Sequence, residues 1–375
     1  MSDILGDSLP SSKANMPRDR PRAIEAAIPA ATANPPSANP PSWRLVQLQT
    51  QGQRRVALVQ EHQLRLLGAE CESIYWLAGA ALAAGQRFTT AITSRLCGET
   101  RDYGEVYLGR SPWRLLPPID HPTEPARCLV SGTGLTHLGS AKDRQAMHSV
   151  VASELNDSIR MFNWGLAGGR PAPGQIGAAP EWFYKGNGQI LRACGEPLEV
   201  PAFAEDGGEE AEIAGLYLVG PDSRVHRLGM AIGNEFSDHV FEKKNYLNLA
   251  GSKMRTCGLG PELVVASSFC TVKGRVSIER GGDVIWFKDI ETGEATMCHS
   301  LANIEHHHFK FDAHRRPGDV HVHFFGAHSL SFGAGIALQD GDIMEVRFPD
   351  FGRPLRNPLR AIRCPPKLVT VEPAQ

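Results

Sequence analysis

The chain lacks the long apolar runs and the one-sided charge that mark membrane proteins and nucleic-acid-binding proteins. A membrane-spanning helix needs about 20 apolar residues in a row, and the apolar stretch YWLAGAALAAG at 75–85 is too short. The 375 residues include 39 Lys and Arg against 41 Asp and Glu, so there is no basic excess for binding a nucleic acid. We expect neither a membrane span nor a nucleic-acid partner.

The sequence also lacks paired cysteines and the common nucleotide and nucleophile motifs. Its eight cysteines are scattered, with no CxxC spacing, which argues against a disulfide framework or a zinc site and predicts reduced thiols in a cytoplasmic protein. No GxSxG elbow is present, and no GxGxxG motif stands between a strand and a helix. These absences argue against a serine hydrolase of that type and against a dinucleotide cofactor.

Bulky apolar residues are scarce in the first 42 residues. This segment is rich in Pro, Ala, Ser and Asn and ends in NPPSANPPSW. Such a composition cannot bury enough surface to offset its chain entropy, so residues 1–42 are predicted to form a disordered N-terminal arm.

The rest of the chain divides into a small part and a large part. Residues 43–120 predict a small N-terminal α+β subdomain, because short alternating runs are followed by a helical stretch from 73 to about 96. Residues 121–375 contain many short strand-like runs separated by Gly, Pro and Asp turns, with helical stretches chiefly at 140–162 and 299–314. This pattern predicts a β-rich α+β domain with a rolled or barrel-like sheet.

A row of acidic residues is the most informative pattern in the second half. Glu210 and Glu212 lie two residues apart in a segment that predicts a half-buried strand, so their side chains share one face while Ala211 and Ile213 share the other. Two neighbouring carboxylates are costly to bury without a partner, and a divalent cation would relieve that cost. An all-oxygen set favours Mg²⁺, Mn²⁺ or Ca²⁺ over zinc, and Glu235 is the natural third ligand. From the pair of Glu210 and Glu212 alone, a solvent-exposed strand face without a cation remains an alternative.

Four ordered blocks, within about 121–360, resemble the fumarylacetoacetate hydrolase superfamily. They are SGTGLTHLGSA; PEWFYKG; EEAEIAGLYLVG with the following GNEFSD; and RPGDVHVHFFG with the terminal GDIMEVRFPDFGRPLRNP. The resemblance implies a mixed β-roll as the catalytic fold of 121–375. It also implies that Glu210, Glu212 and Glu235 coordinate Mg²⁺ or Mn²⁺.

The sequence departs from the family pattern at three places. The water-activating His-x-x-Glu pair of the hydrolases is replaced by Ser140 and Asp143, neither of which supplies imidazole basicity near pH 7. The third ligand is Glu235 instead of the usual Asp. The Thr-Gly-Thr-Pro that often follows Pro-Gly-Asp is replaced by residues 323–326, His-Phe-Phe-Gly. These changes argue against attack of water on a carbon–carbon bond and leave substrate chelation intact.

The pattern resembles the sugar-acid branch of the superfamily, which implies a hydro-lyase acting on a 2-keto-3-deoxy sugar acid. The expected reaction converts 2-keto-3-deoxy-L-arabonate to 2-oxoglutarate semialdehyde by metal chelation of the 2-keto acid, removal of a C3 proton and loss of the C4 hydroxyl. Lys253, partly desolvated beside the cation, is expected to have a depressed pKa and to act as the base. The alternative is a permanently charged Lys253 that pairs with the carboxylates or the substrate.

Further candidates surround this centre. Ser140 and His137 are expected to relay protons, and Lys185, His323 and Thr136 are expected to contact the substrate. For Lys185, a surface or structural role remains an alternative.

Two other functions stay open from the sequence, namely a metal-dependent C–C hydrolase or decarboxylase of a diketo or oxo acid, and a catalytically silent sugar-acid-binding protein. The expected partner is a small-molecule 2-keto sugar acid. Exposed strand edges and the apolar FFG segment at 324–326 also predict a homodimer.

Overall fold

The computed structural model describes residues 43–148, 157–265 and 268–374; the predicted N-terminal arm lies outside this part of the chain. Eighteen strands are described, and they form two sheets. The larger sheet contains β1 (Trp43–Thr50), β2 (Gln53–Gln60), β3 (Gln63–Leu67), β4 (Leu96–Asp102), β5 (Arg114–Leu116), β6 (Cys128–Gly134), β7 (Glu181–Asn187), β8 (Leu191–Arg192), β10 (Ala211–Val219), β11 (Val225–Asn234), β12 (Cys257–Leu259), β13 (Leu263–Val265) and β16 (Val320–Phe324). The smaller sheet contains β9 (Leu198–Val200), β14 (Val272–Arg280), β15 (Asp283–Thr292), β17 (Ile343–Arg347) and β18 (Leu355–Ala361).

Short helices connect and cover these sheets. They are α1 (Ile74–Ala83), α2 (Phe88–Thr93), α3 (Tyr103–Tyr107), α4 (Leu138–His148), α5 (Asp157–Gly168), α6 (His239–Lys244), α7 (Leu249–Lys253) and α8 (Leu301–Phe309). Within the described residues, no helix is both long and apolar enough to cross a membrane. The strand-rich α+β fold expected from the sequence is confirmed, with both parallel and antiparallel pairs in each sheet.

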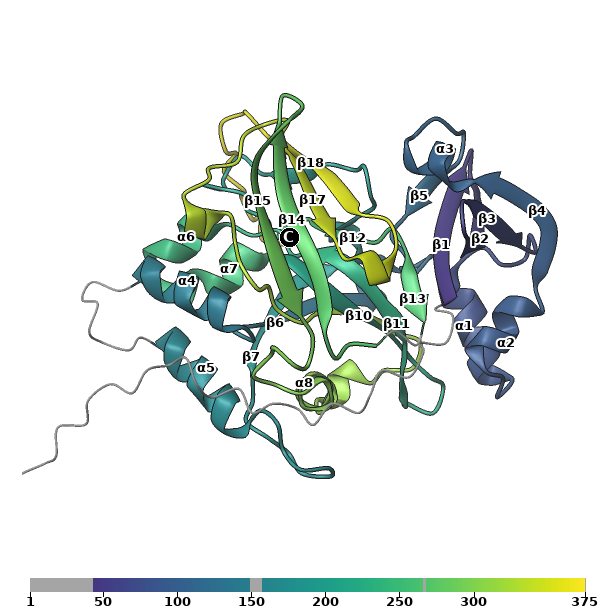
Figure 1. Cartoon of the computed structure of the whole chain (residues 1–375), viewed down its shortest axis with the longest axis horizontal. Helices are drawn as coiled ribbons and strands as arrows, with labels where there is room; N and C mark the ends of the chain where they lie inside the picture. The colour runs from purple at the N-terminus through teal and green to yellow at the C-terminus, as the bar shows by residue number, and fades with distance from the viewer. Residues whose placement is uncertain (1–42, 149–156, 266–267, 375) are drawn as a thin grey trace, which may run out of the picture.

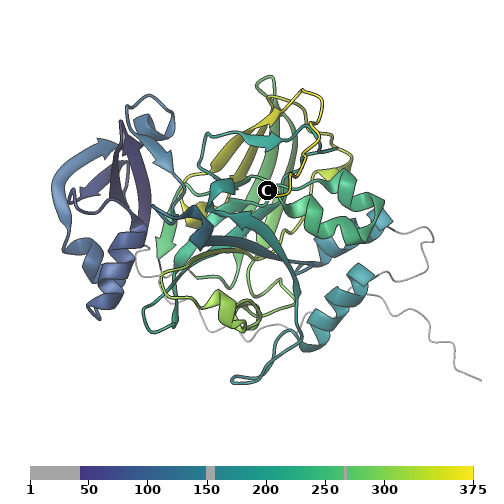
Figure 2. The same ribbon diagram turned by 180° about the vertical axis from the view of Figure 1, so that it is seen from behind.

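The N-terminal part lies at one end of the molecule (Figures 1 and 2). The short alternating runs predicted here are present as β1, β2 and β3, which pair antiparallel in order. The helical stretch predicted from 73 is two helices, and the Ser73 side chain caps α1 by accepting the Trp76 N–H at 3.1 Å. Strand β1 also pairs with β13, so this part continues the larger sheet. A domain boundary near residue 120 remains a prediction.

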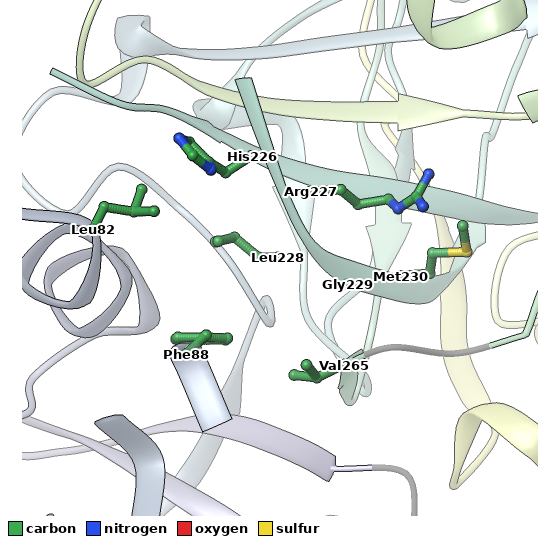
Figure 3. A pocket seen from close by; sticks show the side chains of 8 residues that line it. All are labelled: Leu82, Phe88, His226, Arg227, Leu228, Gly229, Met230 and Val265. Carbon is green, nitrogen blue, oxygen red and sulfur yellow. The ribbon is translucent and has the colours of Figure 1, made fainter. Parts of the chain in front are cut away.

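A cleft marks the place where the two helices α1 and α2 meet β11. Its volume is about 360 Å³, and Figure 3 shows its mostly apolar lining, which includes Leu82, Phe88 and Leu228. A neighbouring apolar groove of about 520 Å³ follows the exposed side of α1. Neither hollow contains a residue of the acidic row.

The centre of the larger sheet is buried on both faces. One face, with Ala214 and Leu216, packs against α1; the other, with Ile213 and Ile232, packs against the smaller sheet at Val276. Full burial of each such aliphatic side chain contributes about 1.5–3 kcal/mol. All nine residues of β10 are buried, so the prediction of a half-buried strand is wrong. Glu212 is therefore held in the interior, where an unpaired charge is costly.

Candidate metal centre

Antiparallel pairing of β10 and β11 brings the three predicted acidic ligands together. Glu212 pairs with Gly233 across the two strands, and the Glu235 N–H donates to the Glu210 carbonyl at 2.9 Å. The start of β10 therefore lies beside the end of β11. One carboxylate oxygen from each of Glu210, Glu212 and Glu235 lies within 4.8 Å of the others, and all three side chains are buried. A solvated strand face is thereby excluded.

Glu212 shows most directly that the donor set fits a cation. Its Oε2 accepts the Gly326 N–H at 2.7 Å, whereas its buried Oε1 has no partner among the described residues. Burial, followed by the charges of Glu235 and Glu210, raises the pKa of Glu212 well above its usual range. A hard divalent cation would satisfy the orphan oxygen and neutralise the crowded charge. The all-oxygen donor set is of the kind that Mg²⁺, Mn²⁺ and Ca²⁺ prefer.

His239, at the first position of α6, orients Glu210. Its Nε2 lies 3.1 Å from Glu210 Oε1. Burial raises the pKa of Glu210, but Lys253 and His239 outweigh that effect and hold it well below its usual range. Sequence reasoning missed His239, although it stands four residues after Glu235. The only signal available was its place directly after the GNEFSD block.

Two buried lysines complete the charge balance. Lys253 Nζ, at the end of α7, donates to Glu210 and to Glu235 Oε2, the latter at 2.6 Å, and lies 4.8 Å from the Phe183 ring centroid. Lys185 Nζ, on β7, donates to Glu235 Oε1, to the Phe236 carbonyl at 2.9 Å and to the Glu235 carbonyl at 3.4 Å. Since an ammonium has three donors, Lys185 has none left for a substrate. Lys185 thus holds Glu235 in place in this arrangement, and its expected role in substrate binding stays a prediction.

The low pKa expected for Lys253 beside a cation stays a prediction, because the contacts of the protein groups alone act in the opposite direction. Burial lowers the pKa of Lys253, but the carboxylates of Glu210, Glu235 and Glu242 outweigh burial and raise it above its usual range. The physical reason is that two carboxylates contact the ammonium directly. Lys253 is thus charged in this arrangement, as the alternative interpretation held, and one of its three N–H donors remains free of the carboxylates.

Thr136 and His137 are connected to the Glu212 carboxylate through the main chain of residues 325–326. Thr136 Oγ1 donates to the Phe325 carbonyl at 2.9 Å, and the next residue, Gly326, donates its N–H to Glu212. The Thr136 hydroxyl has one proton, so it accepts from His137 Nδ1, which lies 2.9 Å away. His137 Nε2 is then an acceptor, and this buried atom has no partner among the described residues. Burial, with His328, lowers the pKa of His137 to about 3, which keeps the ring neutral.

The two positions that replace the hydrolase dyad are engaged in helix α4 and its contacts. The Ser140 hydroxyl donates to the His137 carbonyl at 3.1 Å. The Asp143 carboxylate accepts the Leu330 N–H, and burial nevertheless raises its pKa. Arg144, which sequence reasoning missed, ties the same helix to the site by contacting Glu181 Oε1 at 2.7 Å and Glu242 Oε1 at 2.8 Å.

His323 lies on the opposite face of the sheet from Glu212, and its expected contact with the substrate stays a prediction. Side chains alternate along β16, and Phe324 packs in the cluster that contains Ala214, on the Glu212 face. His323 points the other way, where its ring contacts Ser131 Oγ at 2.9 Å and Thr133 Oγ1 at 2.8 Å. Side chains along a strand point to alternate faces of the sheet, and the sequence alone did not indicate which residues of HVHFF face the three carboxylates.

The same face holds a buried histidine network. Trp182 Nε1–H donates to His308 Nδ1 at 3.1 Å, and His308 Nε2 lies 2.9 Å from His321 Nδ1. The rings of His308 and His323 lie 4.4 Å apart. Burial, then neighbouring histidines, lowers the pKa of His323 to about 3. These rings are therefore neutral in the folded protein.

We expect the network to make stability depend on pH. A histidine with a lowered folded pKa contributes full stability above its unfolded pKa of about 6.5 and loses about 1.4 kcal/mol per pH unit below it. Buried carboxylates with raised pKa values act in the opposite direction, so variants must be compared. His323→Asn should make the unfolding free energy fall less steeply between pH 6.5 and 5, by about 1.4 kcal/mol per pH unit. Denaturant titration at several pH values measures this slope. The exposed control His306→Asn should match wild type, and equal slopes for all three proteins would contradict the prediction.

Comparisons with known proteins place the fold. No family model matches the chain, and no curated sequence matches it. A 2-keto-3-deoxy-D-arabinonate dehydratase complexed with magnesium and 2,5-dioxopentanoate has a TM-score of 0.63 at 18% identity, covering 86% of this chain and 100% of that chain. A fumarylacetoacetate hydrolase from Exiguobacterium antarcticum has a TM-score of 0.54 at 16% identity, with the same coverage. A 2-hydroxyhepta-2,4-diene-1,7-dioate isomerase from Mycobacterium marinum has a TM-score of 0.51 at 16% identity, and it also covers 86% of this chain and 100% of that chain.

These similarities show that the chain has the fold of the fumarylacetoacetate hydrolase superfamily. The resemblance read from the four sequence blocks is thereby confirmed at the level of fold. The neighbours include a dehydratase, an isomerase and a hydrolase, so the fold alone does not select a reaction.

Proposed function

We propose that this protein, with its fumarylacetoacetate hydrolase-like fold, is a metal-dependent dehydratase of a 2-keto-3-deoxy sugar acid. The proposed reaction converts 2-keto-3-deoxy-L-arabonate to 2-oxoglutarate semialdehyde. The observation that carries the proposal is the buried set of Glu210, Glu212 and Glu235, with the orphan Oε1 of Glu212 and Lys253 beside it. The magnesium-bound dehydratase with the same fold supports this assignment.

Glu210, Glu212 and Glu235 are proposed to hold Mg²⁺ or Mn²⁺. Such a cation supplies a Lewis acid that polarises a 2-ketone and acidifies the adjacent C3 protons. Lys253 is the proposed base at C3. A cation held by Glu210 and Glu235 would offset the carboxylate charges that keep the lysine protonated, and the neutral amine would then have the lone pair that takes up the C3 proton. Loss of one C3 proton and of the C4 hydroxyl releases one water and leaves a C3–C4 double bond. Transfer of a C5 proton to C3 then gives the C4–C5 enol, and its tautomerisation gives the dioxo acid.

Residues on the α4 side are proposed to handle the hydroxyl groups. His137 Nε2 offers a buried lone pair that fits a substrate hydroxyl donor. The Thr136 hydroxyl fixes that tautomer. Ser140 stands in the first turn of α4, and among the described residues its hydroxyl has a local partner, the His137 carbonyl. It is the proposed contact for the departing C4 hydroxyl.

The product decides between the dehydratase and a carbon–carbon hydrolase. Incubation of the enzyme and Mg²⁺ with 2-keto-3-deoxy-L-arabonate should give a product that has lost one water, seen by mass spectrometry. A hydrolase would cleave a diketo or oxo acid into two carbon fragments and would place solvent ¹⁸O in a new carboxylate. Two fragments, or no change in the presence of Mg²⁺ and Mn²⁺, would contradict the proposal.

A homodimer is the proposed assembly, although one sequence argument for it fails. The FFG segment is not a surface, because Phe324 and Phe325 are fully buried. Strand β15 is the better candidate: it is the edge of the smaller sheet and exposes Val284 and Phe287 by 56% and 54%. An exposed edge with apolar side chains favours pairing with another chain.

We expect light scattering at micromolar concentration to give twice the chain mass. Phe287→Asp should lower that mass toward one chain, because it places a charge in the proposed apolar contact. Tyr246→Asp changes an aromatic residue of similar exposure elsewhere on the surface and should leave the mass unchanged. A monomer for the wild-type protein would contradict the proposal.

A further inference from the structure

Glu209 is a fourth buried carboxylate beside the candidate centre. It directly precedes Glu210 and is completely buried. Its two oxygens accept from one residue: Oε1 accepts the Ser331 N–H at 2.7 Å, and Oε2 accepts the Ser331 hydroxyl. Glu209 is not one of the three carboxylates that converge on the candidate cation.

Ser331 belongs to a segment, residues 326–336, that borders the centre at three points. Gly326 donates its N–H to Glu212 at 2.7 Å. The Leu330 N–H donates to Asp143 of α4. The Phe332 ring lies 5.2 Å from the ring of His239, the residue that contacts Glu210. The 326–336 segment therefore forms one wall between the carboxylates and helices α4 and α6.

The last part of this wall reaches the surface of the molecule. Its last part is a short 3₁₀ turn, Phe332–Ala334, closed by the Ala334 N–H to the Ser331 carbonyl at 2.9 Å. Gly335 follows with a φ of 75°, and residues 333–335 are exposed. Ser331 is buried at the base of the turn. The pair with Glu209 thus links the turn directly to the residues that lead into β10, beside Glu210.

We infer that Glu209 is a positioning residue, which fixes the 326–336 segment as a wall of the substrate site. The inference rests on the proposed function in one respect, that the substrate binds beside the three carboxylates. It assigns Glu209 an effect on substrate affinity through the wall and little effect on the cation, because Glu209 donates no ligand oxygen.

The test replaces Glu209 with Gln, which keeps the shape but puts an amide donor beside one of the two Ser331 donors. The matched control is Glu262→Gln. Glu262 is equally buried and also holds a backbone N–H, that of Arg353 at 2.9 Å, together with the Tyr103 hydroxyl at 2.8 Å. It lies at the junction with the N-terminal part. Ser331→Ala, which keeps its N–H bond, is the milder second variant if Glu209→Gln does not fold.

Three measurements are made on the full chain: hydrogen exchange of the peptide covering 326–336, the Kd for Mn²⁺, and kcat and KM with 2-keto-3-deoxy-L-arabonate. Glu209→Gln should speed exchange in that peptide and raise KM about tenfold, the equivalent of one hydrogen bond to a charged group. The Kd for Mn²⁺ should change by less than about threefold, well under the tenfold that such a bond represents. Glu262→Gln should change neither the exchange of that peptide nor KM.

Three results would overturn the inference. Unchanged exchange would show that Glu209 does not hold the wall. Faster exchange with an unchanged KM would show a structural role only. A loss of Mn²⁺ affinity of tenfold or more would place Glu209 among the ligands. Failure of the proposed function looks different: the wild-type protein would not turn over the substrate, and hydrogen exchange would still decide whether Glu209 holds the segment.

Discussion

Glu212→Gln should remove the cation and abolish activity. Glu212 Oε1 is the one buried carboxylate oxygen of the three without a protein partner, so it is the atom most available to a metal ion. An amide offers a neutral oxygen and an unwanted donor in its place. Lewis-acid stabilisation is worth several kcal/mol, so we expect a loss of at least about 100-fold in kcat/KM. Isothermal titration should show one Mn²⁺ bound per wild-type chain and none bound to the variant at the same concentrations.

Stability separates this effect from misfolding. Without a cation, a carboxyl whose folded pKa is raised stabilises the fold only while it is protonated, and this contribution is lost as pH rises through the folded pKa. Gln mimics the protonated form at every pH. In EDTA at pH 8, Glu212→Gln should therefore have a Tm equal to or above that of wild type. Glu199→Gln, on the partly exposed surface beside Arg360, should keep both Mn²⁺ and activity.

Removing the metal from the wild-type enzyme provides a second check of the same centre. EDTA should abolish turnover, and added Mg²⁺ or Mn²⁺ should restore it. Full activity in EDTA, or a Glu212→Gln variant that still binds one Mn²⁺, would contradict the assignment of the three carboxylates.

The proximity of the three candidate ligands was predictable because their geometry is local. Residues two apart on a strand share a face, so Glu210 and Glu212 had to project together once a strand was assigned. Glu235 joins them through antiparallel pairing of two consecutive strands, the simplest long-range contact a chain can make. The ordered sequence blocks supplied the fold, which the structural similarities confirm.

The sequence did not show which face or which partner a residue has in three dimensions. The low pKa of Lys253 was inferred from burial and a neighbouring cation, whereas among the protein groups its pKa depends more on the direct contacts with Glu210 and Glu235. His323 was placed in the site by its position in a block, while its face depends on the register of β16 with β6. Arg144 lacked any spacing signal, because α4 reaches the site from a distant part of the chain, and His239 had only its place directly after the GNEFSD block.

Lys253→Ala tests whether the lysine moves a proton or only balances charge. Loss of a positioned acid–base group costs on the order of 100-fold or more in kcat. The variant should keep its Mn²⁺ affinity or gain some, since Glu210 and Glu235 lose a competing cation. Substrate binding through the metal should remain. Lys253→Arg restores the charge without the compact ammonium, so it should rescue stability but not kcat. Lys243→Ala, exposed on α6, is the control.

Deuterium exchange at C3 distinguishes the step at which each residue acts. In D₂O, wild-type enzyme should exchange the C3 protons of the substrate, and Lys253→Ala should not, because no group removes the proton. Ser140→Ala should still exchange them while forming product slowly, since its proposed role concerns the later departure of the C4 hydroxyl. If Lys253→Ala exchanges C3 protons at the wild-type rate, the lysine is not the proton-transfer group. Lys253 would then act only by pairing with the carboxylates. His137 would be the next candidate for the base, because its Nε2 lone pair is buried and has no partner among the described residues.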